Sequence, residues 1–125
     1  MRFGGFVGLP YADGGRGPAF DCLGLFLHVQ RCAFGRELPD PSVLPREWGH
    51  DAAGDMLQGS AREVPVSEIR AGDALLFRIS KSLLHVATAI GGGDMLHTEN
   101  SVGSVIEKLS APKWQARLIG VYRFE

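Results

Sequence analysis

The chain has 125 residues, of which 45% are hydrophobic and 22% are charged, the balance of an ordinary globular protein. At this length we expect one domain, spanning residues 1–125, and not two independent cores. Its 13 Lys and Arg residues nearly balance 14 Asp and Glu residues, so a strongly basic nucleic-acid-binding surface is disfavoured. No run approaches the ~20 apolar residues of a membrane span, and the N-terminus lacks a signal-peptide core. We therefore expect synthesis in the cytoplasm, no nucleic-acid partner and no membrane span.

A loop rich in Gly and Pro is expected over residues 4–20, followed by a helix at about 22–34. The helix is predicted by apolar residues that recur at steps of three and four, namely Cys22, Leu25, Phe26, Val29 and Ala33. Asp21 precedes this run as a good N-cap, and Gly35 follows it as a plausible stop. Residues 36–45 hold three prolines and predict an irregular connection. A second helix is expected at about 45–58, where Trp48, Ala52 and Met56 step by four.

Strands are expected in the second half, at 74–79, 85–90, 95–98, 102–109 and 116–124. Because the helices precede an antiparallel set of strands, the order predicts an α+β fold rather than an alternating α/β fold. The glycine triplet at 91–93 predicts a hairpin between the second and third of these strands.

Cys22 is a candidate nucleophile because it is expected in the first turn of the helix. Free amides and the positive end of the helix dipole favour a thiolate there, although the neighbouring Asp21 opposes it. Gly24 is unusual inside a helix and would leave room for a substrate. The alternative is that Cys22 is a small apolar core residue. A disulfide to Cys32 is not expected, since ten helical residues rise ~15 Å.

Two of the four histidines are candidates for the base that a nucleophilic cysteine needs. His28 and His50 are interpreted as solvated or edge residues. His85 and His97 fall on strands, from which a ring can be held toward a helix packed on that face. A three-residue loop over Gly91–Gly93 would place His97 diagonal to His85 on one face, ~7–8 Å apart. For either histidine taken alone, a half-buried structural role is favoured.

These residues predict Cys22 as nucleophile, His85 as general base and His97 as the group that orients His85. A zinc site formed by the same three residues is disfavoured because none of them belongs to a closely spaced ligand pair. The loop at 14–17 is not a phosphate loop, since no Gly-Lys-Ser/Thr follows it. We expect no metal and no cofactor.

The ordered motifs of the chain resemble the NlpC-type cell-wall cysteine peptidases, a papain-like family. The motifs are Gly8-Leu9-Pro10-Tyr11 with Gly14-Gly15, Phe20-Asp21-Cys22-Leu23-Gly24-Leu25, Arg70-Ala71-Gly72-Asp73 with Phe77, His85-Val86-Ala87 and Met95-Leu96-His97. The resemblance implies a Cys-bearing N-terminal helix packed on a C-terminal antiparallel sheet that bears the histidines. It also implies hydrolysis of peptidoglycan stem peptides, commonly between γ-linked D-glutamate and a diamino acid.

The resemblance further assigns Tyr11, with the Cys22 amide, to stabilising an oxyanion. We also expect Asp21 and Gly24 to contribute to oxyanion stabilisation or substrate binding. The chain departs from the family pattern at Leu23 and at residues 87–89, which affects substrate choice more than reaction type.

The size of the chain and the segment from Arg36 to Asp40 resemble peptidases of phage tail tips and gene-transfer particles. That branch would make tail proteins partners and would place the protein in a virion. Two other functions stay open: a non-catalytic tail-tip assembly module, and an acyltransferase or amidase on a related thiol fold.

Overall fold

The computed structural model describes residues 3–40, 61–80, 83–100 and 102–124. Helix α1 (Cys22–Phe34) is followed by the strands β1 (Arg62–Val64), β2 (Ala74–Ser80), β3 (Leu83–Gly91), β4 (Asp94–Glu99) and β5 (Gly103–Lys108), then by α3 (Pro112–Gln115) and β6 (Leu118–Arg123). Short 3-10 turns lie at Gly4–Phe6 and Val66–Glu68. The helix expected at 45–58 lies outside the described residues.

Helix α1 has the boundaries that its sequence predicts. The Asp21 side chain accepts a hydrogen bond from the Gly24 amide, which satisfies one of the free donors of the first turn. Gly35 ends the helix in the left-handed conformation, at φ 66°, which glycine adopts without strain. The helix is therefore fixed at both ends by local signals.

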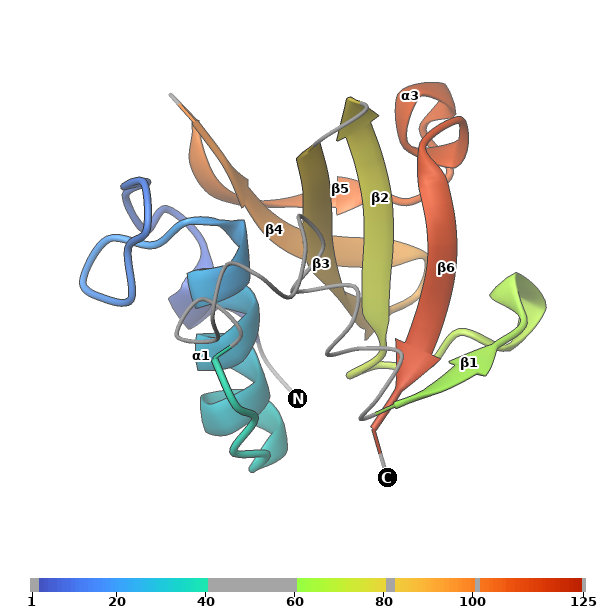
Figure 1. Ribbon diagram of the computed structural model, residues 1–125, viewed down its shortest axis with the longest axis horizontal. Coiled ribbons are helices and arrows are strands. Elements are labelled where there is room, and N and C mark those ends of the chain that lie inside the picture. The colour runs from blue at the N-terminus through green and yellow to red at the C-terminus, as the bar shows by residue number, and fades with distance from the viewer. Residues whose placement is uncertain (1–2, 41–60, 81–82, 101, 125) are drawn as a thin grey trace, which may run out of the picture.

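Six strands form one sheet in the order β1-β6-β2-β3-β4-β5, and every neighbouring pair is antiparallel. The helix packs beside this sheet, against β3 and β4 (Figure 1). The predicted α+β fold is thus confirmed. Two short elements, β1 and α3, were not predicted, because three or four residues carry no periodicity.

The β3–β4 hairpin keeps the predicted register by a different route. Thr88 pairs with Leu96 and Ala89 with Met95, as expected. The turn itself has two residues and not three, because Gly91 pairs with Asp94 and the register shifts between Ala89 and Gly91. All three glycines of the triplet have positive φ, so the bulge and the turn are both unstrained. The bulge supplies the extra residue that the predicted loop would have supplied.

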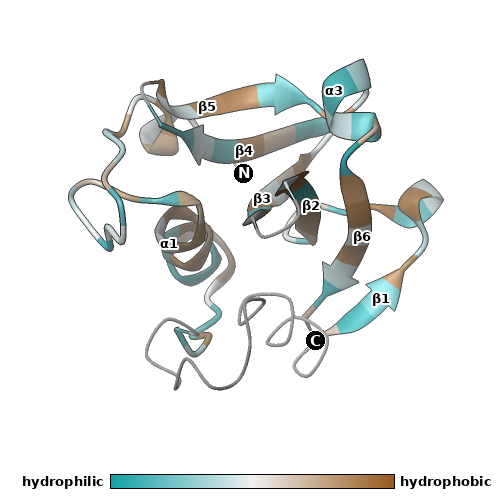
Figure 2. Ribbon diagram, turned by 45° about the horizontal axis from the view of Figure 1, so that its top comes forward, coloured by the Kyte–Doolittle hydropathy of each residue, from teal (hydrophilic) through white to brown (hydrophobic). Residues whose placement is uncertain are grey.

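The two faces of the sheet bury different apolar clusters. On one face, Leu76 and Val86 pack with Phe26 of α1, and Leu96 packs with Leu25 and Val29. The other face holds Phe77, Ala87, Met95 and Trp114. Apolar residues concentrate in β2, β3 and β6, whereas polar residues dominate β1 (Figure 2). The sheet is covered by α1 on one face and by the α3 segment on the other.

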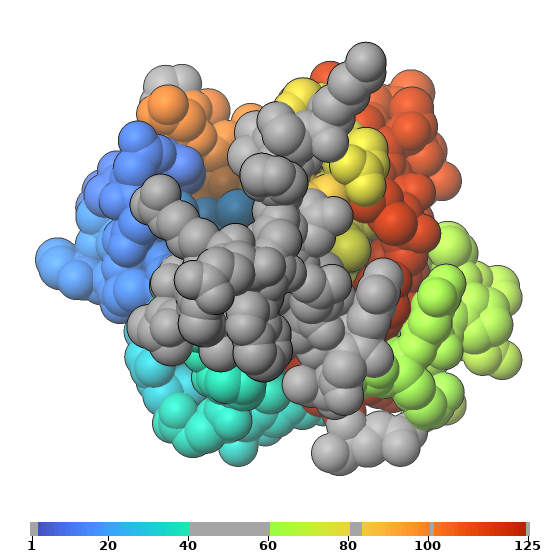
Figure 3. All heavy atoms as spheres, viewed as in Figure 1, coloured from blue at the N-terminus to red at the C-terminus, as the bar shows by residue number. Residues whose placement is uncertain are grey.

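The N-terminal loop is held against the far edge of the sheet. The Ser104 hydroxyl accepts from the Leu9 amide at 2.7 Å and donates to the Phe6 carbonyl at 2.6 Å. Ser104 also exchanges backbone hydrogen bonds with Gly8 and Leu9. The N-terminal segment therefore lies on the side of the molecule opposite β1 and β6 (Figure 3). None of the helices in the described residues is long and apolar enough to cross a membrane.

Candidate active site

Cys22 is the first residue of α1 and lies near the point where the pairing between β3 and β4 stops. The pairs run from Gly91–Asp94 to Thr88–Leu96 and do not continue toward Val86. The Val86 backbone amide is near enough to the Cys22 sulfur to lower its pKa. The helix start therefore meets the sheet beside His85, which is adjacent to Val86 in the sequence.

The two histidine rings contact each other, as the register predicted. His85 Nε2 lies 2.8 Å from His97 Nδ1, and the rings are nearly perpendicular. Both residues are buried, with 8% of His85 and 1% of His97 exposed. Trp114 packs on the pair, stacked on His85 and edge-on to His97. The aromatic contacts fix both rings in position.

The side of the sheet on which these rings lie was predicted wrongly. We expected them to face the helix, but they lie with Phe77 and Trp114 on the opposite face. Alternation along β3 requires this, because Val86 points toward α1 and its neighbour His85 must point away. Cys22 comes near His85 because the helix start meets the strand where β3 and β4 separate.

Glu107 was missed in the sequence, yet it forms the next contact behind His97. Its Oε2 atom lies 2.5 Å from His97 Nε2. His97 pairs with Val105 across β4 and β5, so Glu107 occupies a diagonal position on the same face. The β4–β5 register was the missing signal, since a known pairing would have placed Glu107 beside His97.

Tyr11 lies near Cys22, although its hydroxyl is engaged elsewhere. The hydroxyl donates a hydrogen bond to Asp13 Oδ1 at 3.1 Å, a partner that the sequence analysis did not single out. Burial, followed by this hydrogen bond, raises the pKa of Tyr11 to about 12, so the hydroxyl keeps its proton at neutral pH. Tyr11 therefore carries a proton that it could donate to an oxyanion after turning from Asp13.

Asp21 and Gly24 have structural reasons for their positions. Asp21 caps the helix and also pairs with Arg16, whose guanidinium contacts Asp40 as well. A Cβ at Gly24 would lie 2.0 Å from the Gly15 carbonyl oxygen, so glycine admits the loop backbone and not a substrate. Neither residue lines the cleft that Cys22 lines. Their assignment to the substrate-binding side gains no support from the geometry.

The cleft beside Cys22 has a volume of about 310 Å³ and combines apolar walls with charges of both signs. Cys22, His85 and Tyr11 all line it, and His97 stands behind His85. The remaining lining residues are Ile79, Leu84, Thr98, Glu99, Asn100, Lys113, Trp114 and Arg117. The structure thus brings the sequence-predicted nucleophile and base to one cavity.

The predicted lowering of the Cys22 pKa is wrong for the unliganded protein. Burial raises the pKa of the thiol and is the largest influence, and the Asp21 charge raises it further. Backbone amides of Val86, Leu23 and Cys22 act in the other direction. Desolvation therefore outweighs the helix terminus, and the resting sulfur is a thiol that a base must deprotonate.

Burial also keeps His85 uncharged. It lowers the pKa of His85 from 6.5 to about 3, with smaller contributions from His97 and Lys113. The pKa of His97 is lowered by burial too, although Glu107 opposes that shift. The resting pair is thus a neutral thiol beside a neutral imidazole that has a free lone pair to act as a base.

We expect the stability of the fold to fall as the pH is lowered from 6.5 toward about 3. Between these pH values, His85 binds a proton in the unfolded chain but not in the folded one. Its contribution to the free energy of unfolding is therefore complete above pH 6.5 and is lost as the pH falls toward about 3. The slope from one such group is at most ~1.4 kcal/mol per pH unit. Urea unfolding at several pH values would measure it. His85→Gln should flatten the dependence, and an unchanged pH profile in that variant would contradict the assignment.

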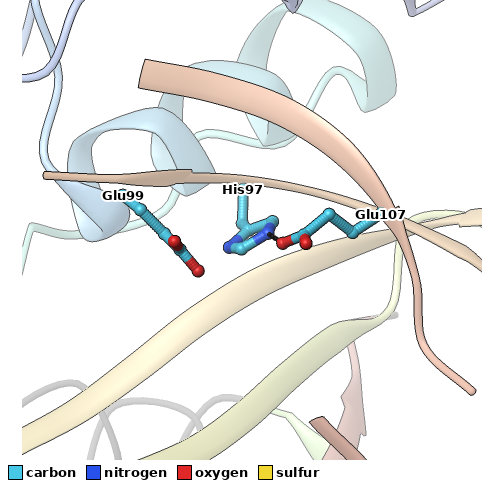
Figure 4. Close-up of side chains that lie close together, drawn as sticks. All are labelled: His97, Glu99 and Glu107. Carbon is cyan, nitrogen blue, oxygen red and sulfur yellow. Dashed lines mark hydrogen bonds and ion pairs between the residues drawn. The ribbon is translucent and has the colours of Figure 1, made fainter. Parts of the chain in front are cut away.

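One group of side chains in the described residues offers three possible metal ligands. His97, Glu99 and Glu107 present atoms that all lie within 4.8 Å of one another. His97 lies between the two carboxylates, and its hydrogen bond is to Glu107 (Figure 4). Both nitrogens of His97 are thus engaged, Nδ1 with His85 and Nε2 with Glu107. A metal ion at Nε2 would have to displace the Glu107 hydrogen bond.

Comparison with known proteins gives consistent matches over nearly the whole chain. The model of the NlpC/P60 family matches residues 8–123. The murein DD-endopeptidase MepS/murein LD-carboxypeptidase of Escherichia coli (strain K12) is 29% identical over 117 residues, 93% of this chain and 56% of that protein. The gamma-D-glutamyl-L-lysine dipeptidyl-peptidase of Bacillus subtilis (strain 168) is 33% identical over 109 residues, 84% of this chain and 32% of that protein. The chain thus spans about half or less of these relatives.

Solved structures share the fold. A lipoprotein-like NLP/P60 family protein from Staphylococcus aureus is 30% identical, with a TM-score of 0.72 over 96% of this chain and 38% of that one. The NlpC/p60 domain of the peptidoglycan hydrolase SagA is 27% identical, with a TM-score of 0.66 over 96% of this chain and 91% of that one. The helix and the antiparallel sheet therefore form a known architecture.

Proposed function

Because the chain belongs to the NlpC/P60 family, we propose that it is a thiol hydrolase acting on peptidoglycan stem peptides. The observation that carries the proposal is the cleft that Cys22 and His85 both line, with His97 Nδ1 2.8 Å from His85 Nε2. Relatives named as a murein endopeptidase and a gamma-D-glutamyl-L-lysine dipeptidyl-peptidase support the substrate class.

The proposed reaction begins with His85 taking the proton of the Cys22 thiol. His85 Nε2 is engaged with His97, so the other ring nitrogen, Nδ1, is the basic atom. The sulfur attacks the amide carbon, and the resulting oxyanion is stabilised by the Cys22 amide and by Tyr11. His85 then protonates the leaving amine as the C–N bond breaks, which leaves a thioester. Water, deprotonated by His85, hydrolyses the thioester and restores the thiol.

The walls of the cleft fit a peptide with charges of both signs. Arg117 and Lys113 can receive carboxylates, and Glu99 can receive an amine, while Trp114 supplies an apolar wall. A γ-D-glutamyl-diamino acid peptide carries carboxylate groups and an amino group. We therefore propose cleavage of the amide bond between γ-D-glutamate and the diamino acid, and not of an amide bond between uncharged residues.

The proposal is tested with synthetic stem peptides and mass spectrometry. We expect hydrolysis of a γ-D-glutamyl-diaminopimelate or γ-D-glutamyl-lysine bond, and far slower hydrolysis of an α-L-glutamyl-lysine peptide. Binding of wall fragments without turnover of any peptide would favour a non-catalytic module. Turnover of lipid or small amides in place of these peptides would favour the acyltransferase or amidase alternative.

Hydrolysis should continue unchanged in EDTA. The nucleophile in the proposed reaction is a thiolate, and both nitrogens of His97 are occupied by hydrogen bonds. The same peptide assay, run on protein dialysed against chelator and with zinc restored, measures the effect. Loss of turnover on chelation, followed by recovery with zinc, would replace the thiol mechanism by a metal-dependent one.

We further propose a tail-associated setting, on the resemblance of the segment from Arg36 to Asp40. Within this chain, Asp40 pairs with Arg16, and Arg36 donates to the Gln30 side chain at 2.9 Å. The segment thus also folds back on α1. Antibody detection of the protein in purified virions, with binding to neighbouring tail proteins, would test this setting.

A further inference from the structure

His85, His97 and Glu107 are linked by two successive hydrogen bonds, and the proposed mechanism does not use Glu107. Its carboxylate reaches His97 from β5, and it does not line the cleft. The second carboxylate near His97 belongs to Glu99, which lies 3.8 Å from the Lys113 ammonium. The close contact of His97 is therefore with Glu107 (Figure 4).

A carboxylate fixes which nitrogen of its imidazole partner carries the proton. An ionised carboxylate only accepts hydrogen bonds, so the ring nitrogen facing Glu107 must be a donor. Burial keeps His97 neutral, and a neutral ring carries one N–H. The proton of His97 therefore lies on Nε2, and its Nδ1 has a lone pair.

The same argument fixes the position of the proton on His85. His97 Nδ1 is then an acceptor, so the 2.8 Å contact requires a proton on His85 Nε2. Neutral His85 consequently has an unprotonated Nδ1, the state that a base must have to take the thiol proton. With the opposite tautomer, His85 Nδ1 would carry an N–H and could not take the thiol proton.

We propose that Glu107 is a positioning residue that sets the tautomers of His97 and His85, and so keeps the catalytic base in its reactive form. The proposal rests on the proposed function for its kinetic consequence, but the tautomers themselves are a property of the unliganded protein. In this role Glu107 accepts the hydrogen bond from His97 Nε2 and transfers no proton.

The first test measures the tautomers directly by ¹⁵N-edited NMR of the imidazole rings at neutral pH in EDTA. Protonated and unprotonated ring nitrogens have separate ¹⁵N shifts, and the rings are assigned with His28→Gln and His50→Gln variants. We expect the Nε2–H form at both His85 and His97. An Nδ1–H form at either ring of the wild-type protein would overturn the proposal, and that result does not depend on a Glu107 variant.

The second test replaces Glu107 by glutamine, which keeps the size of the side chain but can donate as well as accept. We expect a mixture of tautomers at His97 and a fall in kcat on the order of 10-fold to 100-fold. That loss is smaller than the ~10⁴-fold that follows when the residue touching the base is changed. KM should stay the same, since Glu107 is outside the cleft.

Glu63→Gln is the matched control, because Glu63 is an exposed carboxylate on β1 and its loss changes the net charge equally. It should change neither the ring spectra nor kcat. Unchanged rings and unchanged kcat in Glu107→Gln would refute the positioning role while leaving the hydrolase proposal intact. If the wild-type protein cleaves no peptide, the hydrolase proposal fails, and the ring spectra still decide the role of Glu107.

Discussion

Cys22→Ala should reduce hydrolysis of a γ-D-glutamyl-lysine peptide to the assay floor, a loss on the order of 10⁵-fold or more. The sulfur is the protein atom that attacks the amide carbon in the proposed mechanism, and no other residue given a role there is a nucleophile. The side chain is only partly buried at the helix start, and alanine is a good helix former, so the fold should persist. Peptide cleavage and thermal unfolding, measured on the same sample, would separate the two effects.

Cys32→Ala is the control for general loss of a thiol. Cys32 is exposed on α1, 3.7 Å from His28, and does not line the cleft. Its removal should leave turnover near the wild-type rate. Substantial turnover by Cys22→Ala would show that the thiol is not the nucleophile.

Gly24→Ala should both destabilise the protein and abolish its activity. Alanine gains about 1 kcal/mol of helix propensity over glycine. Its Cβ would however lie 2.0 Å from the Gly15 carbonyl oxygen, a backbone atom that cannot rotate away. Overpacking of this kind costs ~1–3 kcal/mol or more, so the clash outweighs the propensity. The loop before Cys22 must move, and with it the start of the helix.

Urea unfolding and peptide hydrolysis would measure both effects of Gly24→Ala. Gly5→Ala provides the comparison, because a Cβ there meets no atom within 4 Å. That variant should stay within ~0.5 kcal/mol of wild type. Wild-type stability in Gly24→Ala would mean that the loop and helix do not approach each other as closely as the structure shows.

Local signals explain what could be predicted from the sequence. Asp21 and Gly35 mark the ends of α1 by side-chain capping and by a left-handed residue, and both effects depend on near neighbours alone. The shared face of His85 and His97 follows from strand alternation and a short glycine turn. The turn type was wrong, yet the bulge between Ala89 and Gly91 preserved the register.

The features that were missed depend on contacts between distant segments. Glu107 reaches His97 only through the β4–β5 register, which pairs His97 with Val105. The direction of the Cys22 pKa depends on how much water the folded protein removes from the sulfur, which the helix pattern does not report. The face on which the histidines lie relative to α1 required the packing of Val86.

The anchoring of the N-terminal loop by Ser104 has a consequence for synthesis of the protein. Phe6 and Leu9 form their hydrogen bonds with a residue about a hundred positions later in the chain, with separations of 98 and 95. During translation, a nascent chain that has not yet released Ser104 from the ribosome holds the thiol and both imidazoles, but cannot secure the loop that carries Tyr11. Hydrogen bonds between residues so far apart in the sequence form late in folding, because the intervening chain must first be ordered. A partly made polypeptide is thereby kept from assembling a finished reaction centre.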